Sequence, residues 1–449
     1  MNLRTIFVFI SISFIYLECS AQPYRFISTL PFPDSLSRGF SPCEPSICIN
    51  PKDEDNIVVG TILDRIYWTH DKGRNWNVQR VTSTYGVYGD PVVICDSSGI
   101  FYFFHLSDPK GTNWKSEEIL DRIVCQKSED GGKTWNDGTY VGLNHPHDQD
   151  KEWAIIDPLT NDLVVSWTEF DTYGDSSKRC QSNILLSRSH DAGKSWDTPT
   201  RVNEISGNCL DGDETVEGAV AAITKKGDLG IVWAGNGGVY FDLQKREGGS
   251  WYSNDIKVTK LYAGWELDIA GFGRANGMPV LKTAWDYHNG NGIFYINWAD
   301  KKRKRFGSDV WLSKSYDKGL TWSKPVTINQ DRTNTDQFFT WMSVDNNTGY
   351  LYFVYYSSQD SENQGINIVM ARSEDEGEAF EELQLNRYPF TPNSDVFFGD
   401  YNTVYCGEET LALAWTITRF GRTRVQTFIA TYDEIDILFG ERKNDFRRK

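Results

Sequence analysis

His105 is the first residue whose type suggests chemistry, because it ends an otherwise apolar segment, "GIFYFFHLS" (99–107). An apolar strand gains nothing from an imidazole, so His105 is either a core histidine with satisfied ring nitrogens or a group that the strand delivers to a site. Tyr173 and Arg179 lie in a polar segment, "TEFDTYGDSSKRCQS" (168–182). A histidine, a tyrosine and an arginine together supply a base, an acid and a cation.

That combination suits β-elimination on a sugar acid. The proton beside a carboxylate can be removed only when a cation neutralises the carboxylate and stabilises the enolate-like intermediate. A neutral His or a Tyr phenolate then acts as base, and a Tyr or His protonates the leaving oxygen. This chemistry requires no cofactor. We therefore expect catalytic roles for His105, Tyr173 and Arg179, and substrate-binding roles for Tyr240, Arg274, His147, Lys151 and Glu217.

Each catalytic candidate also has a structural interpretation. His105 could be a buried core residue, and Arg179 could be a solvated loop residue. Tyr173 and Tyr240 could pack at strand ends, in a chain with 22 tyrosines. The residue types alone therefore leave both interpretations open.

Two groups could hold a metal ion in a structural role. His145, His147 and Asp148 could ligate zinc, although two histidines at i and i+2 without a cysteine are a weak signal. Acidic residues at successive strand starts could cap backbone amides or hold a calcium ion; these are Glu44, Asp90, Glu152 and Glu217.

A repeated pattern, Ser/Thr-x-Asp-x-Gly-x-x-aromatic, indicates the elements that position these residues. It occurs as "THDKGRNW" (69–76), "SEDGGKTW" (128–135), "SHDAGKSW" (189–196), "SYDKGLTW" (315–322) and "SEDEGEAF" (373–380), with a decayed copy, "QKREGGSW" (244–251). In each tight hairpin, we expect the Asp to accept backbone N–H bonds, the Gly to adopt positive φ and the aromatic residue to plug the blade. The pattern resembles the Asp-box, or BNR repeat, of sialidase-like propeller proteins, which implies a scaffold role.

Apolar strands form a second repeat between the hairpins. "IVVGT", "IFYFFHL", "DLVVSWT", "LGIVWAG", "IFYINWA", "YLYFVYY" and "TLALAWT" recur roughly every 60 residues, apart from a shorter first interval. This spacing predicts an all-β fold, a seven-bladed β-propeller occupying residues 22–449 as one domain. The last blade lacks an obvious fourth strand, and we expect "YRFISTLPF" (24–32) to supply it and close the ring.

The strand order of a propeller determines which residues share a face. The repeated apolar strands are the second strands of their blades, so they end on the face where the inner strands begin. The Asp-containing hairpins lie on the opposite face. We therefore expect the His, Tyr and Arg candidates of blades 2 to 5 to converge at the mouth of the central channel, together with Glu44, Gln337 and Asp400 from the remaining blades.

The mature chain resembles a group of secreted, sialidase-like seven-bladed propellers of Bacteroidetes-type bacteria. The resemblance rests on "GDPVVICDSSGIFYFFHLS", "QDKEWAIID", "DETVEGAV", "QFFTWM" and "VFFGDY". This group includes ulvan lyases, which cleave a sulfated algal rhamnose–uronate polymer with a His/Tyr pair and an Arg neutraliser. The resemblance implies that His105 and Tyr173 take those two roles and that Tyr240 is a further site residue. Arg179, Arg188 and Arg274 are the alternatives for the arginine.

Two other functions compete with the lyase. A sialidase needs three arginines around the sugar carboxylate, a Tyr–Glu nucleophile pair and an Asp acid, and we place no convincing third arginine. The family's Phe/Tyr-Arg-Ile-Pro motif is matched only by Tyr24-Arg25-Phe26-Ile27, without the proline. A non-catalytic glycan-binding propeller is the third possibility, because aromatic residues on this face could simply stack on sugars.

The ends, charge and cysteines of the chain restrict its location and partners. Residues 1–21 have the pattern of a secretory signal peptide, with cleavage expected after Ala21. We expect a secreted monomer without a membrane span. A net charge of −16 argues against nucleic acid and anionic membranes, and an acidic polysaccharide would need a local cationic patch. Eight cysteines include Cys19 in the leader; Cys180 and Cys209 are the pair we would test first, and all-free buried thiols are the alternative.

Overall fold

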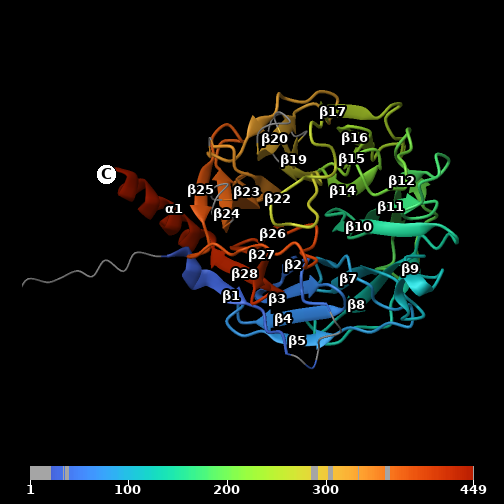
Figure 1. Cartoon of the computed structure of the whole chain (residues 1–449), viewed down its shortest axis with the longest axis horizontal. Helices are drawn as coiled ribbons and strands as arrows, with labels where there is room; N and C mark the ends of the chain where they lie inside the picture. The colour runs from blue at the N-terminus through green and yellow to red at the C-terminus, as the bar shows by residue number, and fades with distance from the viewer. Residues whose placement is uncertain are drawn as a thin grey trace, which may run out of the picture.

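The computed structural model describes residues 22–33, 35, 40–284, 292–301, 307–331, 333–358 and 365–447, and the side chains of these residues up to 440. Seven four-stranded antiparallel sheets are arranged around a central axis in these ranges (Figure 1). The first strands of neighbouring blades contact one another around the ring. The chain is therefore a seven-bladed β-propeller, as the two repeats predict. The expected leader, with Cys19, lies outside the described residues.

Each blade takes its strands in chain order from the axis outward, except that the outermost strand of blade 7 is the N-terminal one. Blades 1 and 2 consist of β2 (Ser46–Asn50), β3 (Asp53–Thr61), β4 (Arg65–His70) and β5 (Asn77–Arg80), then β6 (Val92–Cys95), β7 (Phe101–Leu106), β8 (Ile123–Ser128) and β9 (Thr139–Val141). Blades 3 and 4 consist of β10 (Asp148–Ile156), β11 (Leu163–Phe170), β12 (Ser182–Ser189) and β13 (Thr200–Arg201), then β14 (Glu217–Ile223), β15 (Leu229–Gly235), β16 (Gly238–Gln244) and β17 (Ile256–Lys260).

The remaining blades follow the same order. Blades 5 and 6 consist of β18 (Val280–Ala284), β19 (Ile293–Lys301), β20 (Ser308–Ser315) and β21 (Val326–Thr327), then β22 (Gln337–Val344), β23 (Leu351–Ser358), β24 (Ile366–Ser373) and β25 (Glu381–Gln384). Blade 7 consists of β26 (Thr403–Cys406), β27 (Thr410–Arg419), β28 (Arg422–Thr431) and the N-terminal β1 (Ile27–Thr29), preceded by a 3₁₀ turn, Pro23–Phe26. The seven predicted apolar strands are β3, β7, β11, β15, β19, β23 and β27.

The N-terminal strand closes the ring, as expected from the missing fourth strand. β1 pairs antiparallel with β28, with Ile27 opposite Phe428. The next residue, Leu30, is buried and donates its N–H to the carbonyl of Val425 at 2.9 Å. The first and last parts of the described chain therefore share one sheet (Figure 1).

The Asp-containing hairpins have the predicted geometry. In the third copy, Asp191 accepts the backbone N–H groups of Lys194 and Ser195 at 3.0 and 2.9 Å. Gly193 has φ +79°, and the Trp196 indole donates to Thr139 at 3.1 Å. The Asp carboxylate accepts the free N–H groups of the turn, so the repeated Asp-x-Gly pattern is explained by its role in folding. The all-β fold predicted from sequence did not include α1 (Tyr432–Arg447), which packs against blades 6 and 7 through buried Ile435, Leu438 and Phe439.

A backbone irregularity recurs where the inner strands begin. In five blades, a residue with positive φ stands two positions before the first regularly paired residue of the inner strand; these are Glu44, Asp90, Lys151, Gly218 and Phe339. Four of them are not glycine, so the backbone strain has to be offset by surrounding contacts. Such strain is concentrated at functional sites in many proteins. This end of the channel is thus the place to look for a site; we call it the entry face, and the opposite one the hairpin face.

Candidate functional site at the channel mouth

A cluster of charged residues occupies the channel mouth on the entry face. Its members come from the segments at or before the inner strands and from the 171–181 loop of blade 3. We call it the axial cluster and define it as Glu44, Asp90, Asp150, Lys151, Glu152, Tyr173, Asp211, Glu217, Arg274 and Asp400. Four residues expected at the site from sequence, Lys151, Tyr173, Glu217 and Arg274, are therefore brought together.

Arg274 connects two carboxylates across the channel. Its guanidinium lies 2.9 Å from the Asp211 carboxylate and 3.1 Å from Asp400 Oδ2. Asp400 also contacts the ammonium of Lys151, which lies 3.7 Å from Asp90. The negative charge of Asp400 outweighs burial and, together with that of Asp211, raises the pKa of Arg274 above its ordinary value, so the guanidinium stays charged.

Tyr173 joins this ion-pair network through its hydroxyl. The hydroxyl donates to Asp211 Oδ2 at 2.6 Å, and the backbone N–H donates to Asp148 at 2.7 Å. Burial, together with the negative charges of Asp150 and Asp211, raises the pKa of Tyr173 well above its ordinary value. Tyr173 is therefore protonated at neutral pH and can act as a proton donor.

Several carboxyl groups of the cluster have raised pKa values. Burial, followed by Asp211 and Asp150, raises the pKa of Glu217 well above its usual range. Burial and then Asp90 raise the pKa of Glu44, Asp150 and Glu152 in the same direction. In contrast, Lys151 and Arg274 outweigh burial and lower the pKa of Asp400. The cluster is thus less negative than its composition suggests.

Exposure separates the residues that a ligand can reach from those that support them. The Arg274 side chain is 36% exposed and that of Asp211 10%, and Tyr173 is half-buried. Glu217, Glu44 and Asp400 are fully buried, with at most 1% exposure. The accessible part of the cluster is therefore a carboxylate, Asp211, in contact with a phenol on one side and a guanidinium on the other.

An aromatic surface adjoins Tyr173. The Trp114 ring, in the short 3₁₀ turn Asn113–Lys115, lies 5.6 Å from the Tyr173 ring at an interplanar angle of 29°. Trp114 is 57% exposed. Trp265, which is buried, donates its indole N–H to Asp211 at 3.1 Å. An exposed indole beside a polar site is a common platform for the apolar face of a sugar ring.

His105 does not lie in this cluster. It is fully buried within β7, where its Nδ1 lies 2.7 Å from the Leu106 carbonyl and its Nε2 3.1 Å from Gln126 Oε1. Its ring lies 5.2 Å from that of Phe103. Burial lowers the pKa of His105 to about 4. The strand alternation that places Phe103 between blades also places His105 there, so its observed surroundings are those of a core histidine.

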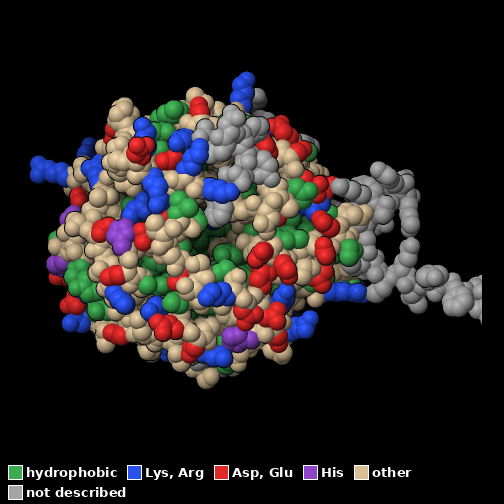
Figure 2. Space-filling view, turned by 180° about the vertical axis from the view of Figure 1, so that it is seen from behind, with side chains coloured by type: hydrophobic (Ala, Val, Ile, Leu, Met, Phe, Trp, Pro, Cys, Tyr) green, Lys and Arg blue, Asp and Glu red, His purple; other side chains and the backbone are tan. Residues whose placement is uncertain are grey.

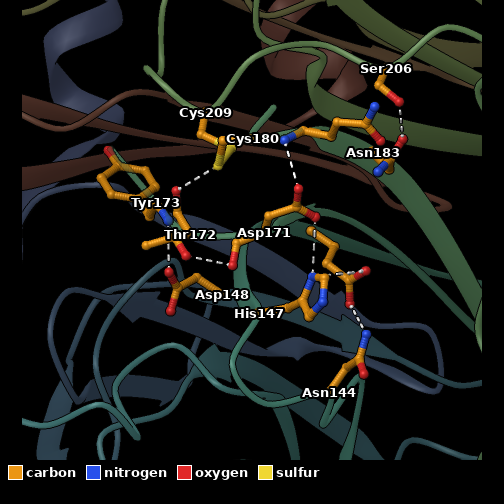
Figure 3. A network of polar contacts seen from close by, with 12 residues as sticks. Asn144, His147, Asp148, Asp171, Thr172, Tyr173, Cys180, Asn183, Ser206 and Cys209 are labelled. Carbon is orange, nitrogen blue, oxygen red and sulfur yellow. Dashed lines mark hydrogen bonds and ion pairs between the residues drawn. A yellow bond between two sulfur atoms is a disulfide. The ribbon is translucent and has the colours of Figure 1, made fainter. Parts of the chain in front are cut away.

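Three other expected site residues lie outside the axial cluster. Arg179 is exposed on the 171–181 loop, and Tyr240 stacks on Trp233 at 6.1 Å in blade 4. His147 lies under the Tyr173 loop, with Nδ1 3.5 Å from Asp171 and 3.8 Å from Glu169 (Figure 3). The figure also shows the disulfide between Cys180 and Cys209, the pair we selected from sequence.

Sequence reasoning missed Asp211 and Trp114, which complete the site. Asp211 follows Cys209 in "NCLDGDETVEG" (208–218), so the disulfide carries it to the Tyr173 loop. The acidic residues of this segment precede an inner strand, and from that position Asp211 could have been predicted as a site residue. Trp114 lies in a connection that has no repeat pattern. Its contact with Tyr173 depends on how blades 2 and 3 are placed beside each other.

Neither a grouped set of metal ligands nor a membrane-spanning helix occurs among the residues that the structure describes. Across these residues, no three His, Cys, Asp or Glu side chains are grouped suitably for a metal ion. Within the same residues, no helix is both long and apolar enough to span a bilayer.

Comparisons with known proteins support the architecture. No protein-family model and no curated protein matches the chain. Among solved structures, a polysaccharide lyase described as an ulvan lyase, bound to -[GlcA(1-4)Rha3S]-, is 11% identical with a TM-score of 0.55, covering 89% of this chain and 97% of the other. A Dyadobacter fermentans protein of unknown function also matches, with 11% identity and a TM-score of 0.48 over 90% of this chain and 98% of the other. A Hadza microbial sialidase matches with 13% identity and a TM-score of 0.48 over 84% of this chain and 73% of the other. The likeness to the ulvan lyase establishes a shared fold, the β-propeller, which in this chain has seven blades.

Proposed function

We propose that the protein is a polysaccharide lyase that cleaves a uronate-containing glycan by β-elimination at the axial cluster. The observation that carries the proposal is the accessible contact set of Tyr173, Asp211 and Arg274, with 2.6 Å between the phenol and the carboxylate and 2.9 Å between the carboxylate and the guanidinium. Together they supply the acid, the base and the cation that the reaction needs.

Arg274 is the group that neutralises the substrate carboxylate. Its side chain retains 36% exposure while two protein carboxylates hold it in place. A fixed guanidinium can donate two parallel N–H bonds to a planar carboxylate. Its charge stabilises the enolate-like intermediate, and Arg274 therefore replaces Arg179 as our choice for this role.

Tyr173 and Asp211 form the proton-transfer pair. The Asp211 carboxylate accepts the C5 proton, the bond between C4 and the glycosidic oxygen breaks, and the Tyr173 hydroxyl protonates the leaving oxygen. The hydrogen bond between the two residues then returns the proton from Asp211 to the phenolate, which restores the starting state. The raised pKa of Tyr173 keeps its hydroxyl protonated, so a proton is available for the leaving oxygen.

The aromatic surface and the fold neighbour indicate the substrate class. Trp114 can stack on a sugar ring beside the reacting bond. The lyase with the TM-score of 0.55 is described as bound to a glucuronate–sulfated rhamnose unit, so an ulvan-type polymer is our first substrate. The disulfide supports the expected secretion, since such bonds persist in oxidising compartments.

A glycoside hydrolase is the second candidate. Glu217 and Asp150 have raised pKa values beside other carboxylates, which is how glycosidases maintain a protonated acid. However, Glu217 has no exposure and Asp150 7%, and Arg274 is the one arginine of the axial cluster. These observations place the hydrolase second to the lyase.

The deciding experiment is to incubate the protein with ulvan, with other uronate polymers and with a sialoglycan. A lyase generates the ultraviolet absorbance of an unsaturated uronate, and this signal should be lost in the Arg274→Gln variant. Release of sialic acid or reducing sugar without that absorbance would establish the hydrolase instead. Binding without any product would indicate a glycan-binding propeller.

A further inference from the structure

A cavity lies in the central channel beyond the axial cluster. Its volume is about 210 Å³, and its walls come from the inner strands of blades 1, 2, 3, 5, 6 and 7. A hollow with hydrophobic side chains is visible at the centre of the face in Figure 2. The cavity and the axial cluster thus occupy different levels of the same channel.

Three aromatic residues separate the two levels. Trp153 and Trp341 have ring centroids 4.2 Å apart, and Tyr401 lies 5.6 Å from Trp153 and 6.2 Å from Trp341. All three are buried and come from blades 3, 6 and 7, so their rings meet across the channel. Tyr401 follows Asp400 directly, which places this aromatic plug immediately below the axial cluster.

Lys282 is the cation of the lower cavity. It lies in the middle of β18, among walls that include Ile47, Val93 and Trp341. Within the described part of the chain, no Asp or Glu forms an ion pair with it, whereas Lys151 above the plug has two such partners. Burial lowers the pKa of Lys282 below its usual value, as expected for an amine without a counter-charge.

The titratable groups that face Lys282 supply no negative charge at neutral pH. Burial raises the pKa of the Cys48 and Cys406 thiols to about 12. The Cys95 thiol and the Tyr405 phenol also have raised pKa values, from burial for Cys95 and from Cys48, then burial, for Tyr405. Lys282, whose side chain is partly exposed, is therefore a single cation among neutral groups, and its desolvation is unfavourable unless a partner supplies the opposite charge.

We propose that the lower channel is a binding site for a small carboxylate with an apolar body, whose negative charge pairs with Lys282. The apolar walls would contact the hydrocarbon part, and the Ser46 and Thr403 hydroxyls lie in the same lining. Because the aromatic plug separates this ligand from Tyr173 and Arg274, the site is distinct from the glycan site. A cationic or uncharged ligand would leave the amine unpaired.

The test uses benzoate as the probe and benzamide as its neutral counterpart, titrated calorimetrically into the full chain. Benzoate should bind at least ten-fold more tightly than benzamide. Lys282→Met, which keeps the length of the side chain but removes the charge, should weaken benzoate binding at least ten-fold and leave benzamide binding unchanged. The melting temperature of this variant should be equal to or above that of the wild type, since a partly buried amine without a counter-charge is removed.

The matched control is Lys194→Met, which removes an exposed lysine from a hairpin and should leave benzoate affinity unchanged. Equal affinity of the wild type for benzoate and benzamide would overturn the proposal, and so would absence of benzoate binding. This comparison needs no variant, so it stands even if Lys282→Met fails to fold. Unchanged benzoate affinity in a folded Lys282→Met protein would likewise assign the amine a purely structural role.

Discussion

At the scale of single residues, the role that we propose for Tyr173 depends on its partner rather than on its residue type. Many of the chain's 22 tyrosines fill the core, and Tyr67, Tyr102 and Tyr295 are at most 1% exposed. Tyr173 differs because its hydroxyl meets a carboxylate that is itself held by an arginine. A phenol in that position can give up a proton and recover it through the same hydrogen bond.

Tyr173→Phe should therefore lower kcat on a uronate polymer by about 10² to 10⁴-fold, because the leaving oxygen loses its proton donor. The ring stack with Trp114 remains, so KM should change little. The wild-type rate should not increase between pH 8 and 10, since the pKa of Tyr173 is raised and the protonated form is the active one. Steady-state rates across this range provide the measurement.

The control for Tyr173→Phe is Tyr140→Phe, which alters another aromatic residue with 39% exposure, in β9. It should retain the wild-type rate. A rate that increases steadily with pH would show that the phenolate is the base, and a fully active Tyr173→Phe protein would remove Tyr173 from the chemistry altogether.

His105 illustrates the opposite case, in which a reactive residue type stabilises the fold. Its pKa is about 4 in the native protein, against 6.5 when unfolded. Between these values the unfolded chain binds a proton that the native chain does not, so stability falls as the pH is lowered from 6.5 to 4. The expected loss in the free energy of unfolding is about 3 kcal/mol.

The loss is best measured as a difference between the wild type and His105→Gln, by chemical denaturation at pH 7.5, 5.5 and 4.5. The variant has no titrating group at this position, whereas the buried carboxyls with raised pKa contribute equally to both proteins. The difference should shift in favour of the variant as pH falls. A large loss of kcat with unchanged stability would instead restore His105 as a catalytic base.

At the scale of elements, the site depends on two loops that a disulfide holds together. Cys180 ends the loop that carries Tyr173, and Cys209 begins the segment that carries Asp211. The carbonyl of Cys209 also accepts the N–H of Gly174 at 2.7 Å. The bond between Tyr173 and Asp211 therefore spans two loops that no β-ladder joins at these residues.

Replacing both Cys180 and Cys209 by Ser should lower the free energy of unfolding by about 2–4 kcal/mol. It should also lower kcat/KM at temperatures where the protein remains folded, because Tyr173 and Asp211 lose their fixed separation. Thermal melts and steady-state kinetics measure the two effects. In a merely structural role, the disulfide would change stability alone.

The control is Cys406→Ser, which alters a free cysteine of blade 7 away from these loops. It should leave the kinetics unchanged. If the double Ser variant has wild-type kcat/KM, the loops are positioned by their own hydrogen bonds and not by the disulfide.

At the scale of the whole molecule, the repeats made the architecture predictable and the site only partly so. The apolar strands and hairpins recur with each blade, so seven blades and the closing strand followed from counting. The convergence of Lys151, Glu217 and Arg274 followed from the strand order. The position of His105 did not, because strand alternation, rather than the strand's end, decides whether a side chain faces the channel or a neighbouring blade.

Asp211 and Trp114 were beyond this reasoning for a different reason. Both lie in connections whose course is set by tertiary contacts, a disulfide for Asp211 and ring stacking for Trp114. Repeat patterns describe the strands and hairpins that all blades share, whereas these two site residues lie in connections that differ from blade to blade. For that reason the scaffold was easier to predict from sequence than the chemistry.

The closing strand gives a test of the complete ring. Deleting residues 1–32 removes β1 and leaves β28 as an unpaired edge, which favours association with other chains. It also removes buried Leu30, the burial of which contributes about 1.5–3 kcal/mol. The truncated chain should melt at a lower temperature and elute from size exclusion partly as aggregate.

A chain lacking only residues 1–21 is the matched control, because it retains β1 and should melt like the full-length chain. Leu30→Ala in that chain should produce an intermediate loss, since the strand pairing remains while the side chain is shortened. We expect this order of melting temperatures because main-chain bonds to β28 and the buried Leu30 side chain together close the ring. Equal melting temperatures for all three chains would mean that the other blades hold the propeller closed without β1.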